Sequence, residues 1–205
     1  MYIDMSTLSP GRVYLTMIQT LIPRPIAWVL SENEDATYNL APFSYFNAVC
    51  SDPPLIMFSV SKQQDGRDKD TRANIEARGE FVIHIAHREM ANDVTQSSAT
   101  LAPGESEVSA QGLDLAEFEN FSLPRLRDVR IAYACKLDRV LEVGNNNQQG
   151  LIFGEVQYLY ADDGVLGEDA KGRSIFAAEK IDPIGRLGGG EYTTFGDKFF
   201  IPRPQ

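Results

Sequence analysis

The chain has 205 residues, of which 43% are hydrophobic and 23% are charged. With 19 basic and 29 acidic residues, its net charge is −10. This composition excludes a disordered chain, and the length suits one domain with a sizeable core or one domain with appendages. The negative charge argues against nucleic acid as a partner, because phosphate backbones would be repelled.

The start of the chain has no basic region followed by an apolar run, and no apolar stretch is long enough to span a bilayer. We therefore predict no membrane partner. Cys50 and Cys135 lack the spacing of zinc or dithiol sites, and their apolar surroundings predict two buried thiols. Together these features predict a cytoplasmic protein without a metal site.

The predicted strands are short and rich in β-branched and aromatic residues. In chain order they cover residues 26–30, 38–49 (interrupted at Pro42), 55–60, 81–86, 131–143 and 151–160. Helices are predicted from Asp70 or Thr71 to about 77, over 88–97 and around 174–179, and a loop over 102–112. Short turns at 31–35 and 144–150 favour antiparallel pairing, so we expect a mainly β fold, an antiparallel barrel with a few helices.

Two of these strands contain residues that packing alone does not require. Residues 23–29 read Pro-Arg-Pro-Ile-Ala-Trp-Val, and residues 39–49 read Asn-Leu-Ala-Pro-Phe-Ser-Tyr-Phe-Asn-Ala-Val. Proline donates nothing to a strand ladder, and a buried amide or hydroxyl is costly unless it is paired. The polar groups of both segments are therefore expected to face a ligand.

Further short motifs follow in order along the chain. They are Asp52-Pro53-Pro54-Leu55, Lys69-Asp70-Thr71 with Asn74, Gly79-Glu80-Phe81-Val82, Gly154-Glu155-Val156, and Arg186-Leu187-Gly188-Gly189 with Tyr192. With the two strands above, this ordered set resembles the flavin reductase-like family, the FMN-binding split-barrel proteins that include flavoredoxin. The resemblance implies a single domain over residues 1–205, with a core at about 20–192. Its fold would be an antiparallel Greek-key split barrel that forms a homodimer with two equivalent FMN sites.

The activity implied by the resemblance is oxidoreduction of flavin reductase type. NADH or NADPH would donate hydride to bound FMN, which would pass electrons to a second flavin, a small acceptor or a redox protein partner. The flavin carries the reactivity, so no catalytic residue is predicted. Two alternatives stay open: a flavoredoxin-type electron carrier with tightly bound FMN, and a flavin-binding protein without turnover.

The strongest candidate for a phosphate site is Lys69-Asp70-Thr71. A helix start offers unpaired N–H groups and the positive end of a dipole, to which Lys69 adds charge and Thr71 a hydroxyl. The residues alone favour an ordinary N-cap at Asp70 or Thr71. The resemblance implies that this stretch, with Asn74, lies beside the FMN.

The remaining candidates come from the polar strands and the glycine-rich motif. Backbone groups at Ala41 and Pro42, with the side chains of Ser44 and Asn47, could meet the flavin ring edge, because an amide both donates and accepts. Alternatively, Ser44 and Asn47 satisfy neighbouring strand ends. Other cofactor-binding candidates are Arg24, Pro25, Gly188, Gly189 and Tyr192. Arg24, next to Pro25, could grip phosphate or form an intersubunit ion pair.

Other motifs are rejected. His84 and His87 would point to opposite faces of a strand, so a metal site is not predicted there, and His84 is expected to be a core or strand-end histidine. Many members of the family have Asn at that position. No G-x-G-x-x-G opens a helix after a strand, so the sequence does not distinguish NADH from NADPH.

Overall fold

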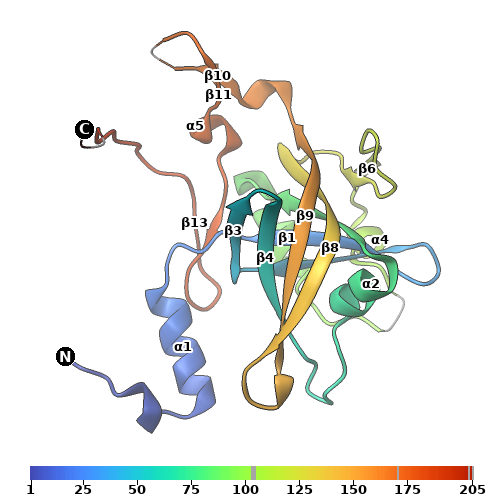
Figure 1. Ribbon diagram of the computed structural model, residues 1–205, viewed down its shortest axis with the longest axis vertical. Helices are drawn as coiled ribbons and strands as arrows, with labels where there is room; N and C mark the ends of the chain where they lie inside the picture. Colours follow the sequence, from blue (N-terminus) through green and yellow to red (C-terminus); the bar gives the residue numbers. More distant parts are fainter. Residues whose placement is uncertain (103–104, 170, 203, 205) are drawn as a thin grey trace.

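The computed structural model describes residues 1–102, 105–169, 171–202 and 204. Its centre is a seven-stranded antiparallel sheet in the order β2-β1-β5-β8-β9-β4-β3 (Figure 1). The strands are β1 (Ala27–Glu32), β2 (Tyr38–Phe43), β3 (Phe46–Ser51), β4 (Pro54–Ser61), β5 (Glu80–Ile85), β8 (Ile131–Val143) and β9 (Gln149–Ala161). The mainly β, antiparallel fold predicted from the sequence is confirmed.

The sheet is rolled but not closed. β2 and β3 lie at its opposite edges, although only Ser44 and Tyr45 separate them in the chain. A link of this length spans about 10 Å at most, so the two edges must approach each other. Within the described residues, no strand pairing joins β2 to β3. β4 and β5 are separated in the sheet by β9 and β8, a connection of Greek-key type.

Two hydrophobic clusters cover the two faces of the sheet. Val29, Phe58 and Phe81 belong to the cluster inside the barrel. Trp28 and Leu126 belong to the cluster outside, which the segment between β5 and β8 covers. Residues 27–31 of β1 are all buried because β1 is packed on both faces, which explains its nearly continuous apolar sequence.

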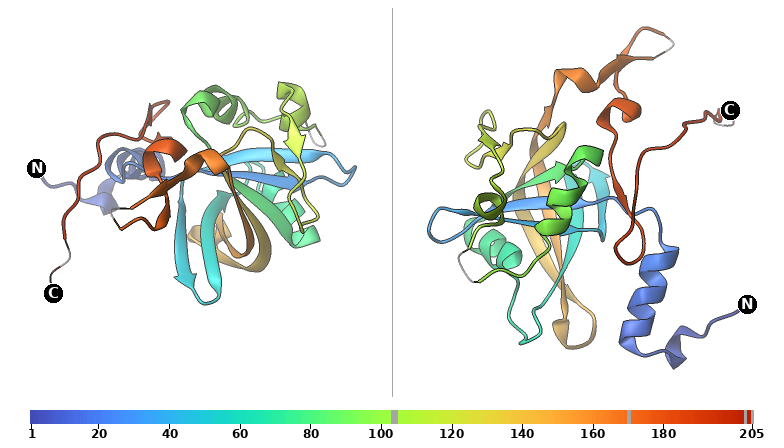
Figure 2. Two further views of the ribbon diagram at one scale, coloured as in Figure 1. Left: turned by 90° about the horizontal axis from the view of Figure 1, so that it is seen from above. Right: turned by 180° about the vertical axis from the view of Figure 1, so that it is seen from behind.

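The main helices lie on different sides of the barrel. α1 (Pro10–Thr20) and both chain ends lie on one side, and α2 (Asp70–Arg78) and α4 (Glu107–Gln111) lie on the other (Figures 1 and 2). α2 ends at Gly79, which has φ +75° and donates its N–H to the Ile75 carbonyl at 2.8 Å. Glycine adopts this left-handed conformation without strain. No helix of the described residues is long and apolar enough to cross a membrane.

The remaining elements are short. They are η1 (Met5–Thr7), η2 (Arg88–Met90), α3 (Ala91–Gln96), β6 (Leu115–Ala116), β7 (Arg125–Leu126), η3 (Asn145–Asn147), η4 (Asp163–Val165), β10 (Leu166–Glu168), β11 (Ser174–Phe176), α5 (Ala178–Ile181), β12 (Gly185–Arg186) and β13 (Tyr192–Thr193).

Several local predictions are corrected. The 38–49 strand breaks at Ser44 and Tyr45 and not at Pro42, because an edge strand tolerates a proline whose nitrogen faces away from its partner. Part of the predicted 102–112 loop is α4, where the Ser106 hydroxyl accepts the Ser109 N–H at 3.2 Å, although residues 103 and 104 lie outside the described residues. Residues 174–176 form β11, and a helix follows.

The two cysteines differ in exposure. Cys135 is fully buried in β8, as predicted. Cys50 is exposed, so that part of the prediction is wrong. It lies on β3, where residues 47–51 are all exposed. An apolar strand sequence therefore does not ensure burial when the strand lies at the edge of the sheet.

Candidate functional site

A cavity of about 800 Å³ opens beside the edge strand β2 and the start of α2. Its wall also includes the loop that leads into α2, residues 97–101 after α3, and the start of α4. Five of the predicted cofactor-binding residues line it: Ala41, Pro42, Lys69, Asp70 and Thr71. Two predicted segments that are distant in sequence are thus brought together in one cavity.

The start of α2 is open toward this cavity. Lys69 occupies the N-cap position in an extended conformation, and no side chain caps the helix. The first N–H groups of a helix have no partners within the helix, so they can donate to a ligand and they carry partial positive charge. Thr71 is buried, and its hydroxyl accepts a hydrogen bond from the Asn39 amide at 2.9 Å, which leaves its own proton available to donate.

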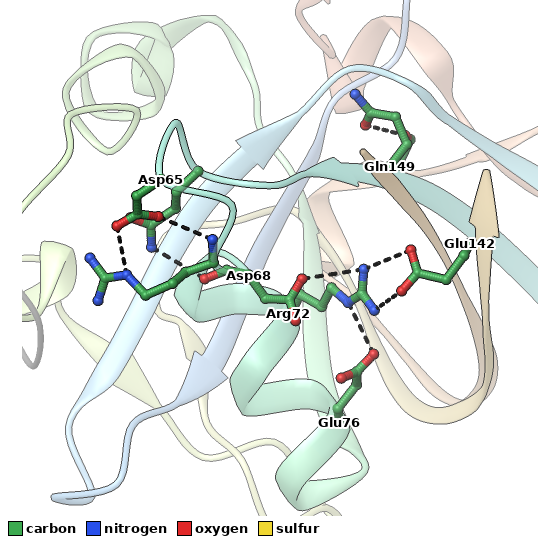
Figure 3. A network of polar contacts seen from close by, with 9 residues as sticks. Asp65, Asp68, Arg72, Glu76, Glu142 and Gln149 are labelled. Carbon is green, nitrogen blue, oxygen red and sulfur yellow. Dashed lines mark hydrogen bonds and ion pairs between the residues drawn. The ribbon is translucent and has the colours of Figure 1, made fainter. Parts of the chain in front are cut away.

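The charges of the cavity wall are only partly paired. Arg67 forms an ion pair with Asp65 at 2.7 Å. Asp68 lies 3.4 Å from Arg72, a buried residue that also pairs with Glu76 and with Glu142 of β8 (Figure 3). This network ties α2 and the loop before it to the barrel.

Two lysines of the cavity wall are not engaged in this way. Among the described residues, neither Lys62 nor Lys69 has an ion-pair partner. Both ammonium groups are therefore available to an anion at the start of α2, within a chain whose net charge is negative.

Ala41 and Pro42 belong to the edge of the sheet. They pair with β1 through Val29 and Trp28, and the other edge of β2 faces outward. The Leu40 N–H points to the outward edge, where Glu107 accepts it, so the backbone of Pro42, two residues further on, also faces outward, and that of Ala41 faces β1. Because proline has no N–H, this part of β2 presents the Pro42 carbonyl and a small apolar surface at the cavity.

Arg24 is buried outside the cavity wall and uses four of its five N–H donors within the chain. Its guanidinium donates to the carbonyls of Ile18 and Leu21 at the end of α1, and to the Leu187 carbonyl at 2.8 Å. Its Nε donates to the Ser44 hydroxyl at 3.3 Å. These contacts cap α1 and tie it to the 187–190 loop. Within the single chain they form a structural clamp, and the phosphate grip and the intersubunit ion pair that the sequence left open stay predictions.

The other polar candidates are also outside the cavity wall. Asn74 donates to the Asn33 side chain at 2.8 Å, which fastens α2 to the end of β1. Pro25 and Asn47 are exposed, and the Asn47 side chain accepts only the neighbouring Ala48 N–H, at 3.0 Å. Among the described residues, Asn47 neither lines the cavity nor contacts a residue that does, so its ligand-binding role stays a prediction.

The glycine-rich motif packs on α1. A Cβ on Gly188 would lie 2.5 Å from Cγ of Gln19, so α1 requires glycine there, and Gly189 has φ +62°. The Tyr192 hydroxyl lies 2.9 Å from the Thr95 hydroxyl. The cofactor roles that the resemblance implies for these three residues stay predictions.

The two histidines have partners within the protein. His84 is completely buried: its Nδ1 lies 3.0 Å from the Trp28 carbonyl and its Nε2 accepts the Leu126 N–H at 3.1 Å. Burial lowers the pKa of His84 to about 4, so the imidazole is neutral. His84 is a core histidine, as expected. His87 lies 3.2 Å from Glu89, and burial lowers its pKa too.

Comparisons with known proteins agree with this architecture. The family model described as a flavin reductase like domain matches residues 19–181, most of the chain. This chain belongs to the flavin reductase-like family. Nitrilotriacetate monooxygenase component B of Bacillus cereus has a TM-score of 0.89 at 32% identity, over 98% of both chains.

Two further solved structures resemble this flavin reductase-like protein. The 2-nitrobenzoate 2-nitroreductase of Pseudomonas fluorescens has a TM-score of 0.87 at 31% identity, over 100% of this chain and 96% of that one. A structure from Shewanella frigidimarina NCIMB 400 with a split-barrel domain has a TM-score of 0.83 at 20% identity, over both full chains, and shows the fold alone. The split barrel is thus confirmed, and at family level the protein is a flavin-related oxidoreductase.

Sequence reasoning missed several lining residues of this flavin reductase-like protein. Lys62 directly follows β4 and belongs to no recognisable motif. Residues 97–101 follow the short helix α3 and likewise carry no motif. Glu107 lay within a predicted loop. Its only sequence signal is a serine followed by an acidic residue, the start of a capped helix, a pattern too common to indicate a site by itself.

Proposed function

We propose that this protein binds FMN in the cavity at the start of α2, and that NADH or NADPH reduces the bound flavin, which passes electrons to a second flavin or another acceptor. The observation that carries the proposal is the uncapped start of α2 with Lys62 and Lys69 on the wall of an 800 Å³ cavity. Acidic residues also line this wall, so an anionic cofactor would be held by these two unpaired lysines and by the helix N–H groups.

The cavity fits the group in size and in chemistry. Small-molecule sites commonly enclose about 300–1,000 Å³, which includes this volume. The N–H groups of α2, the Thr71 hydroxyl and the two lysine ammonium groups are donors suited to a phosphate. The Pro42 carbonyl is an acceptor for the polar rim of a ring system, and the apolar strand edge at Ala41 and Pro42 suits its face.

The residues of the chain would bind and orient the cofactor. When bound, the flavin supplies the redox chemistry, so the protein needs no acid, base or nucleophile at a reacting atom. Lys62, Lys69 and Thr71 would hold the phosphate. The edge of β2 would fix the ring plane, and the Arg72 network would keep α2 at a constant distance from β2.

A visible absorption spectrum of the purified protein tests this proposal, taken before and after anaerobic addition of NADH and then NADPH. We expect yellow flavin bands, or bands acquired with added FMN, that bleach with one of the two nucleotides. Bands that stay oxidised would support an electron carrier reduced by a protein. A colourless protein that takes up no FMN would overturn the proposal.

We also propose that the protein acts as a homodimer. α1 exposes Tyr14, Leu15 and Met17, and β3 exposes five of its six residues, including Val49. Unpaired strand edges and contiguous apolar surface are typical of interfaces. A second copy seated there would cover Cys50.

Light scattering after gel filtration tests the dimer. Leu15→Glu should convert it to monomer. Leu141→Glu provides a matched control, because Leu141 is also an exposed leucine but lies on β8. A monomeric wild-type protein, or equal behaviour of the two variants, would contradict the proposed interface.

A further inference from the structure

Glu107 is a buried acid in the wall of the proposed flavin cavity. It opens α4, directly after Ser106, and only 7% of the residue is exposed. A carboxylate is rarely this buried unless a specific contact requires it, because removing its charge from water is costly.

The contact is with the edge of the sheet. One carboxylate oxygen of Glu107 accepts the Leu40 N–H at 2.9 Å. The Ser106 hydroxyl donates to the Tyr38 carbonyl at 2.6 Å. Both partners lie on the outward edge of β2, where the next strand of a sheet would otherwise bind. α4 therefore clamps β2 immediately before Ala41 and Pro42, the residues that face the cavity.

The same segment is held from α2. The Asn39 side chain, between the two clamped residues, donates to the Thr71 hydroxyl at 2.9 Å. A displacement of β2 at Leu40 would thus move both the strand edge proposed to hold the ring and the hydroxyl proposed to hold the phosphate.

The charge of Glu107 is opposed by its surroundings. Burial raises its pKa, the Leu40 N–H counteracts this, and Asp70 at the start of α2 raises the pKa further. On the other cavity walls, Lys62 and Lys69 are cationic, Asp65 is paired with Arg67, and Asp68 lies beside Arg72. A phosphate at the start of α2 would add negative charge next to Asp70.

We propose that Glu107 is a positioning residue that fixes β2 for the flavin and takes up a proton from solvent when the flavin phosphate binds. A protonated carboxyl group keeps a carbonyl oxygen for the Leu40 N–H, so proton uptake relieves the repulsion without releasing the strand. The clamp rests on contacts within the chain, and the proton uptake rests on the proposed function.

The clamp is tested without any ligand, by hydrogen exchange of the Leu40 amide measured by NMR. Glu107→Ala should accelerate this exchange by at least about tenfold, because the amide loses its acceptor. Glu107→Gln keeps an oxygen acceptor and should exchange at the wild-type rate. Glu119→Ala, which removes an exposed carboxylate, is the matched control. Unchanged exchange in Glu107→Ala would overturn the positioning role.

The proton uptake is tested by the pH dependence of flavin affinity, measured by fluorescence titration from pH 5.5 to 8. Relative to Glu107→Gln, the wild-type protein should lose affinity for FMN as the pH rises, by about 3- to 10-fold over this range. Comparing the two proteins cancels the ionisation of the phosphate itself. Riboflavin, which lacks the phosphate, should show no such difference.

The outcomes separate the two proposals. Parallel FMN profiles for wild-type and Glu107→Gln protein would overturn proton uptake while leaving FMN binding intact. A wild-type protein that binds neither FMN nor riboflavin would overturn the proposed function and the proton uptake with it. The Leu40 exchange would still decide whether Glu107 holds β2.

Discussion

At the end of α1, the Arg24 guanidinium donates to three backbone carbonyls and one hydroxyl. At the start of α2, by contrast, no side chain caps the helix, and Lys69 has no ion-pair partner among the described residues. Both regions combine a helix end with a cation, and both looked like ligand sites in the sequence. Only the second leaves its donors available and opens on a cavity.

The difference shows what separates a structural charge from a binding charge. A buried cation is stable in a fold when its donors are all paired, and it then has nothing left to offer a ligand. A helix start that keeps open donors beside solvent loses little stability and can bind an anion. Experiments that remove each charge should therefore affect stability in one region and affinity in the other.

The largest effect is expected from Arg24→Ala. This change leaves the Ile18, Leu21 and Leu187 carbonyls without their donor, and we expect a loss of about 4 kcal/mol in unfolding free energy. FMN affinity of the folded protein should be unchanged. Urea denaturation and flavin titration measure the two quantities. Arg12→Ala is the control, because Arg12 is an exposed arginine of α1, the helix whose end Arg24 caps.

The opposite result for Arg24 would reverse the comparison. If Arg24→Ala folded with normal stability but lost FMN affinity, the phosphate role would hold and the end of α1 would be part of the site. Arg24→Lys adds a further check, because a lysine cannot reach several carbonyls with a fixed fork of donors and should recover little of the stability.

The sequence supports different parts of this account to different degrees. Strands at 131–143 and 151–160 were predicted within two residues of β8 and β9, because β-branched and aromatic runs bounded by turn residues are strong local signals. The Lys69–Thr71 segment was predicted because a helix start is also local. Arg24, by contrast, donates to the carbonyl of Leu187, which is distant in sequence, so no local pattern could predict that contact.

Exposure was the other quantity that local patterns could not give. Cys50 and Cys135 both lie in apolar runs, yet one strand is at the edge of the sheet and the other is central. Strand order is set by pairing across the whole chain. The same holds for Glu107, which becomes a cavity residue only because α4 packs on the edge strand β2.

At the start of α2, the double variant Lys69→Ala with Thr71→Ala should weaken FMN binding by about 3 kcal/mol, or roughly 100-fold, because two donors to a charged group are lost. Unfolding free energy should change much less. Thr71→Ser keeps the hydroxyl and should bind normally. Lys171→Ala, an exposed lysine of the β10–β11 hairpin, is the control. Unchanged affinity in the double variant would remove the phosphate assignment.

His84 extends the comparison to a second buried polar group whose partners lie within the protein. Burial lowers its pKa from an ordinary 6.5 to about 4, so between these values the unfolded chain binds a proton that the native protein does not. Stability should therefore fall as the pH falls, by about 2 kcal/mol between pH 7 and pH 5. His84→Asn should lose this part of the pH dependence.

NMR of the wild-type imidazole checks the same point directly. Its resonances should not titrate above about pH 5 in the folded protein. An imidazole that titrates near its ordinary pKa would mean that solvent reaches it, and would contradict its assignment as a buried core histidine.

The smallest effect is expected from Tyr192→Phe. Its hydroxyl bonds to Thr95, an exposed residue that can return to water, so the loss of stability should be about 1 kcal/mol or less. Tyr2→Phe, a change at an exposed tyrosine outside the proposed dimer interface, is the control. In the single chain Tyr192 does not line the cavity, so FMN affinity should be unchanged. A loss of affinity with unchanged stability would mean that Tyr192 reaches a flavin which a single chain does not enclose. The site would then be completed by a second copy.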